Sequence, residues 1–96
     1  TRLNIVADLL IIKSYDKNVI KGKIVAIPNA DPGFDWIFSH NIAGLVTQYG
    51  GVNSHMAIRC AELGIPAAIG VGDKIYENLY EGRLMLDCKK GQLEYV

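Results

Sequence analysis

Glycine and proline interrupt this chain at short, regular intervals, and this spacing favours short helices and short strands throughout. The unbroken apolar runs between the interruptions are far shorter than the ~20 residues that a membrane-spanning helix needs. The sequence shows no internal repeat and no low-complexity tract. We therefore expect a globular domain with no membrane-spanning segment. The turn signals stand at Gly22, 28–33, Gly50, Gly51, 64–66, 70–72, Gly82 and Gly91.

Length, charge and cysteine content narrow the class further. The 96 residues suit one domain, 1–96. Ten Lys and Arg residues balance ten Asp and Glu residues, which argues against a nucleic-acid partner because such proteins usually carry a basic patch. Cys60 and Cys88 form no CxxC motif and fit buried thiols in a reducing compartment better than a zinc site or a disulfide. Because no signal sequence opens the chain, we expect a cytoplasmic location, and the first residue, Thr1, suggests a piece of a longer multidomain chain.

The pattern of apolar residues predicts an α/β domain that is rich in strands. One clear helix is expected over 54–63, with Asn53 or Ser54 as the N-cap, Gly64 as the C-cap and Pro66 just beyond. One or two helical turns are expected over 34–39. This mixture suggests sheets with helices packed on one face. Strands are expected over 9–14, 23–27, 43–49, 67–71, 83–88 and 92–96, with a hairpin turn at 89–91.

The junction between the strand at 43–49 and the helix at 54–63 carries the most informative residues. Helical spacing places His55, Arg59 and Glu62 on one polar stripe, so His55 is expected on an open face at the first turn. The opposite, packing side is expected to hold mainly Ala57, Ile58, Cys60 and Ala61.

A histidine at a helix N-terminus has an unusual electrostatic setting. The unpaired N–H groups and the helix dipole disfavour a cation there by roughly 0.3–1 kcal/mol, which keeps the imidazole neutral and nucleophilic. A phosphoryl group on His55 would add negative charge beside these N–H donors. Gly50 and Gly51 allow backbone amides to approach an anion closely. Local physics therefore favours a phosphohistidine over a histidinium, as a covalent carrier requires.

Composition and spacing alone nevertheless favour an ordinary capped helix with a surface histidine. No GxxxxGK[ST] or GxGxxG loop indicates a nucleotide site. Arg59 lies one turn after His55 and could contact an anion held there, but an ion pair with Glu62 is at least as well supported.

The remaining candidate residues are better explained by structural roles. Asp31 and Asp35 suit turn and capping roles better than a metal site or an acid–base pair, because no third ligand is evident. His40 lies in a polar turn and is expected to be solvated or to cap. The aromatic residues of the same segment are expected in the core or at a domain contact; they are Phe34, Trp36 and Phe38.

Residues 42–72 closely resemble the mobile, or swivelling, phosphohistidine domain of phosphoenolpyruvate-utilising enzymes. This family includes pyruvate phosphate dikinase, phosphoenolpyruvate synthase, enzyme I of the sugar phosphotransferase system, and glucan and rifamycin phosphotransferases. Weaker similarity extends over about three quarters of the chain. The matching segments are 43–47, Gly50-Gly51, Ser54-His55 and 62–70.

The resemblance implies a three-layer β/β/α swivelling domain in which His55 is the phosphorylated residue. Gly50, Gly51, Asn53 and Ser54 then surround the phosphate, and Arg59 is a further candidate. An ATP-grasp domain, expected in the same polypeptide, passes the phosphoryl group from ATP to the histidine, and the group then moves to an acceptor-substrate domain. ATP and Mg²⁺ are expected on the partner domain, with no cofactor or metal in this one.

Three positions depart from the family pattern. Asn53 stands where many members have Thr, so regulation through that Thr does not carry over. Many members have Arg at the position of Ala61, whereas this chain has Arg59. Met56 replaces a small residue, a change expected to affect docking.

Three functions follow from the resemblance. The leading one is a phosphocarrier of a dikinase-type phosphotransferase serving pyruvate and phosphoenolpyruvate, inactive as an isolated domain. The second keeps the carrier and changes the acceptor to a rifamycin-type antibiotic or a glucan. The third is a non-catalytic regulatory module that retains the fold.

Overall fold

The structure, a computed structural model, describes residues 4–12, 20–29, 32–51, 53–87 and 92–96. Its strands and helices are short, as the turn signals predicted. No helix of the described residues is long and apolar enough to cross a bilayer. In chain order the elements are β1 (Asn4–Ile11), β2 (Ile24–Asn29), the 3₁₀ helix η1 (Pro32–His40), β3 (Gly44–Tyr49), α1 (His55–Leu63), β4 (Ala67–Ala68), α2 (Asp73–Glu77), β5 (Arg83–Asp87) and β6 (Gln92–Tyr95).

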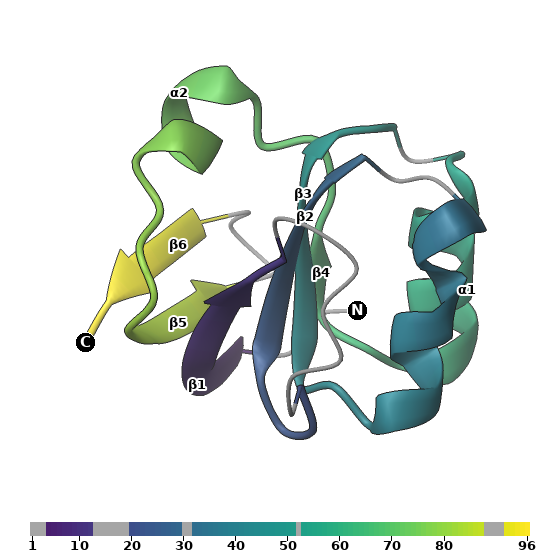
Figure 1. The fold of residues 1–96 in the computed structure, drawn as a ribbon, viewed down its shortest axis with the longest axis horizontal. Helices are drawn as coiled ribbons and strands as arrows, with labels where there is room; N and C mark the ends of the chain where they lie inside the picture. Colours follow the sequence, from purple (N-terminus) through teal and green to yellow (C-terminus); the bar gives the residue numbers. More distant parts are fainter. Residues whose placement is uncertain (1–3, 13–19, 30–31, 52, 88–91) are drawn as a thin grey trace.

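The six strands follow the order β4-β3-β2-β1-β5-β6. β1 to β4 are parallel, whereas β5 pairs antiparallel with both β1 and β6. β1 serves both halves: residues 4–8 pair with β5, and residues 9–11 pair with β2. This shared strand lets the antiparallel part fold over one face of the parallel part (Figure 1). The helices η1 and α1 cover the other face, so the three-layer β/β/α arrangement is confirmed.

β2 lies between the two outer layers, and its sequence explains why. Ile24, Val25, Ala26 and Ile27 are all fully buried. Because side chains alternate along a strand, Val25 and Ile27 join the core beneath the helices, and the other two join the core beneath β5. A continuous apolar run is typical of a parallel strand covered on both faces.

Helix α1 begins and ends at the predicted caps. The Oγ of Ser54 accepts a hydrogen bond from the Ala57 N–H at 3.4 Å, and Gly64 takes the left-handed conformation with φ 69°. Met56 and Cys60, one turn apart, are buried and anchor the helix to the sheet. The predicted packing side was therefore wrong in part: Cys60 is buried as expected, but Ile58 and Ala61 are exposed.

Several predicted boundaries also differ from the structure. β1 begins at Asn4 because β5 pairs with its first half. β2 continues through Pro28 to Asn29. β4 is only two residues long, and Gly70, with φ 71°, then bends the chain. Residues 13–14 of the first predicted strand, Cys88 and the predicted turn at 89–91 lie outside the described residues.

Helix α2 was not predicted. Tyr76 of this helix packs against the core beneath β5, so the expectation of helices on one face holds for η1 and α1 but not for α2. The helix is five residues long and none of them is buried, so its sequence carries no apolar periodicity to find.

Candidate functional site

In the turn between β3 and α1, Gly50 lies against Gly70 of the segment that follows β4. Gly50 has φ 131°, which favours glycine, and its carbonyl oxygen would lie 2.3 Å from a Cβ on Gly70. The Ser54 N–H donates to the Gly51 carbonyl at 3.0 Å. A Cβ on Gly51, by contrast, would meet open space. The approach of the Gly50 and Gly51 amides to an anion stays a prediction. This turn leads the chain directly into α1.

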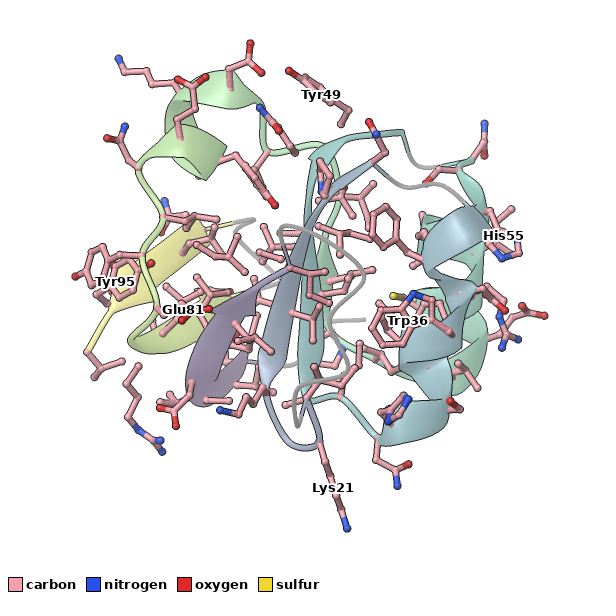
Figure 2. All side chains as sticks on the ribbon, in the orientation of Figure 1. Lys21, Trp36, Tyr49, His55, Glu81 and Tyr95 are labelled. Atoms are coloured by element: carbon pink, nitrogen blue, oxygen red, sulfur yellow. The ribbon has the colours of Figure 1, made fainter. Side chains whose placement is uncertain are left out.

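His55 is the first residue of α1, where the helix dipole is positive. Its side chain is 39% exposed, and it points outward from the helix layer (Figure 2). Ser54 lies beside it as the N-cap, and Asn53 lies exposed in the preceding turn. The open face predicted for His55 is therefore confirmed.

Asp35, from η1, contacts the imidazole of His55. The distance from His55 Nε2 to Asp35 Oδ1 is 2.9 Å. The hydrogen bond from His55 is the largest cause that lowers the pKa of Asp35 below its usual range, with Arg59 adding to the effect. Because an ionised carboxylate has no proton to donate, Nε2 carries the proton in this contact.

Asp35 had been predicted to serve a turn or a cap, and the structure instead places it beside the histidine. The two residues are 20 positions apart, so no helical or strand spacing relates them. Only the packing of η1 against α1 brings them together. Asp31, the other carboxylate considered, lies outside the described residues.

Arg59 also joins this cluster through Asp35. Its Nε lies 3.3 Å from Asp35 Oδ1, and its guanidinium carbon lies 5.4 Å from the centre of the Phe38 ring. The structure shows these contacts to η1 rather than the predicted pair with Glu62. Two residues of η1, Asp35 and Phe38, thus hold the side chain of Arg59, which lies one helical turn after His55.

The other residues of this region have structural roles. Met56 is fully buried, so its side chain cannot touch a docking partner directly. Phe34, Trp36 and Phe38 are half-buried against the core beneath the helices, which confirms the first of their two predicted roles. His40 is exposed, and its ring meets the Trp36 ring edge-on at 5.8 Å.

Together, these contacts place the imidazole of His55, at the positive end of a helix, beside a carboxylate that also contacts an arginine. Such an arrangement suits covalent attachment of an anionic group better than metal chemistry. Within the described part of the chain, no group of three or more His, Cys, Asp or Glu side chains is placed to hold a metal ion.

Comparison with known proteins identifies a family and several relatives. The chain matches the family described as "PEP-utilising enzyme, mobile domain" over residues 19–91. It is 35% identical over 84 residues to the phosphoenolpyruvate synthase of Aeropyrum pernix, an alignment that covers 85% of this chain and 10% of that protein. It is 34% identical over 76 residues to the phosphoenolpyruvate synthase of Escherichia coli, covering 78% of this chain and 9% of that protein.

A second kind of relative carries a different name. The chain is 39% identical over 62 residues to the rifampicin phosphotransferase of Bacillus cereus, covering 65% of this chain and 7% of that protein. In all three comparisons, the chain spans about a tenth or less of the relative's length.

Proposed function

Because the chain belongs to the family of PEP-utilising enzyme mobile domains, we propose that it is a phosphocarrier. Its His55 receives a phosphoryl group at one partner site and delivers it to a second. The observation that carries this proposal is the half-exposed His55 ring at the first position of α1, with Nε2 2.9 Å from Asp35 and with Arg59 one turn away.

The electrostatic setting supports a role as carrier. A cation on the His55 ring opposes the helix dipole, whereas a phosphoryl group on that ring complements it. The side chain of Arg59 adds a positive charge to the site, because its Nε lies 3.3 Å from the Asp35 oxygen that also contacts the His55 ring. The helix dipole therefore favours an anion on the His55 ring over a cation.

We assign both reacting partners to other domains of a longer polypeptide. The sequence contains no nucleotide-binding loop of a familiar type, so ATP and Mg²⁺ are placed on an ATP-grasp domain. The small share of each relative that this chain covers leaves room for such domains. Gly50, Gly51, Asn53 and Ser54 form the turn that surrounds the phosphoryl group in this proposal.

Pyruvate and phosphoenolpyruvate are the proposed acceptor and product. The names of the synthase relatives support this pair. A rifamycin-type antibiotic is the second candidate acceptor, because the rifampicin phosphotransferase relative is 39% identical over the aligned region. The two acceptors leave the chemistry of His55 unchanged.

The test is phosphate mapping on the natural full-length protein after incubation with ATP and Mg²⁺, or with phosphoenolpyruvate. Samples stay at alkaline pH because phosphohistidine hydrolyses in acid. We expect phosphate on His55 and none after His55→Ala. The matched control is His40→Ala, which removes the other histidine of the chain and leaves labelling intact. Absence of labelling with both donors, in folded protein, would favour the non-catalytic module.

A further inference from the structure

One carboxylate oxygen of Asp35 contacts both His55 and Arg59. Oδ1 of Asp35 lies 2.9 Å from His55 Nε2 and 3.3 Å from Arg59 Nε. The carboxylate of Asp35 therefore occupies the space between the ring nitrogen and the guanidinium. It does so from η1, an element separate from the helix that carries the other two residues.

A phosphoryl group on Nε2 needs the same space. Its anionic oxygens would lie just beyond that nitrogen, at the position of Asp35 Oδ1. Arg59 contacts the same Oδ1, so a phosphoryl oxygen at that position would meet the guanidinium. The two anions cannot occupy this position together, because their oxygen atoms would overlap and their like charges repel each other. The carboxylate and the phosphoryl group are thus alternative occupants.

We propose that Asp35 is a positioning residue that stands in for the phosphoryl group, holding His55 and Arg59 while the carrier is empty and yielding both when it is loaded. This inference rests on the proposed phosphocarrier function. It adds a regulatory consequence: Asp35 stabilises the empty carrier relative to the loaded one.

The positions of the two ring protons change during transfer. In the empty state Nε2–H donates to Asp35, so Nε2 first releases its proton to solvent while Nδ1 takes one up, and the ring stays neutral. The Nε2 lone pair then forms the N–P bond, the P–O bond of the donor breaks, and its electron pair stays on the departing oxygen. Arg59 passes from the carboxylate to the phosphoryl oxygens.

The partial exposure of the three side chains lowers the free-energy cost of replacing the Asp35 carboxylate by a phosphoryl group. Their exposed fractions are 39% for His55, 43% for Asp35 and 35% for Arg59. Contacts between partly exposed charges contribute little each, so they hold the empty site without preventing loading. A deeply buried pair would resist the exchange much more.

The decisive experiment measures the loaded fraction of His55 in the full-length protein at a fixed ratio of phosphoenolpyruvate to pyruvate. Asp35→Asn keeps the size of the side chain and removes its charge, and Asp35→Ala removes the contact. We expect both to raise the ratio of loaded to empty carrier by roughly three- to tenfold, as suits two partly exposed charge contacts. Glu62→Gln, an equal change of charge on the exposed face of α1, leaves the ratio unchanged.

Arg59 provides the readout that a merely structural role would not move. In an Arg59→Ala background the Asp35 substitutions should have a smaller effect, because one of the two competing contacts is already absent. A loaded fraction that stays the same or falls after Asp35→Asn would overturn the inference. So would an equal rise after Glu62→Gln.

A second measurement separates this inference from the proposed function. Inorganic phosphate is titrated into unphosphorylated wild-type protein and the Asp35→Ala variant, and the imidazole NMR signals of His55 are followed. We expect several-fold tighter phosphate binding after Asp35→Ala, because the place between His55 and Arg59 is vacated. If neither donor labels wild-type His55, the carrier function fails, and equal phosphate binding by the two proteins would then overturn the Asp35 inference as well.

Discussion

The segments that follow β3 and β4 each contain a glycine and lead into a helix, but the two helices differ. Gly50 follows β3 and precedes α1; Gly70 follows β4 and precedes α2, and the two glycines touch. α1 is nine residues long and begins with a serine cap, whereas α2 is five residues long and its Gly72 cap lacks a side-chain hydrogen bond. The first turn therefore supports a helix anchored in the core, and the second supports only a short surface helix.

The first residue of each helix shows the more instructive difference. α2 begins with Asp73, whose carboxylate accepts hydrogen bonds from the Gln48 amide at 2.8 Å and from the Tyr49 hydroxyl. This bond to Asp73 raises the pKa of Tyr49. α1 begins instead with His55. The first position of α2 thus carries an acidic side chain, whereas the first position of α1 carries the residue that we propose as the phosphoryl carrier.

The largest expected effect comes from giving α1 the residue type that begins α2. His55→Asp removes the nucleophile, so we expect complete loss of acid-labile phosphate in the full-length protein. The helix dipole favours the new carboxylate by about 0.3–1 kcal/mol, and repulsion from Asp35 opposes it, so the fold should remain. Circular dichroism checks the fold. Residual acid-labile labelling at the level of wild type would refute the assignment of His55.

The next prediction concerns the contact between the two turns. Gly70→Ala places a Cβ 2.3 Å from the Gly50 carbonyl oxygen at a φ of 71°, so we expect destabilisation by about 3 kcal/mol or more. Urea unfolding followed by Trp36 fluorescence measures it. Gly51→Ala is the matched control, because its Cβ meets open space, and it should stay within about 0.5 kcal/mol of wild type. Equal effects of the two substitutions would contradict the contact.

The serine cap distinguishes α1 from α2 and should have a moderate effect. Ser54→Ala removes the acceptor of the Ala57 N–H and should cost about 0.5–1 kcal/mol, the lower part of the usual range because the bond is 3.4 Å long. Ser54→Asp retains a capping oxygen and should restore stability in the same unfolding assay. A loss of equal size in both variants would show that the cap is not the cause.

The smallest expected effect is the pH dependence of Asp35. Its pKa is lowered in the folded chain, chiefly by the hydrogen bond from His55, so the folded state binds this proton less tightly than the unfolded state. The stability that Asp35 adds is therefore present above its unfolded-state pKa of about 3.9 and is lost as the pH falls through the lowered value. Urea unfolding across acidic pH, compared with Asp35→Asn, measures this difference. A difference that grows as the pH falls would contradict the sign.

The strands and the main helix were predicted well where the signal is local. The apolar run of β2 and the caps of α1 each depend on neighbouring residues, and both are confirmed. Predictions failed where a distant partner decides the outcome. Residues 4–8 become strand because β5 lies beside them, and α2 forms without any buried residue of its own.

The candidate site divides in the same way. Local sequence was enough to place His55 at the exposed start of a capped helix, because capping and helical periodicity act over only a few residues. The partner of that histidine is a matter of tertiary structure. Asp35 contacts both His55 and Arg59 only because η1 packs against α1. Arg59 therefore pairs with Asp35, whereas local spacing had favoured Glu62. Short-range hydrogen bonds determine where a helix begins, whereas the packing of separate elements determines which charges meet.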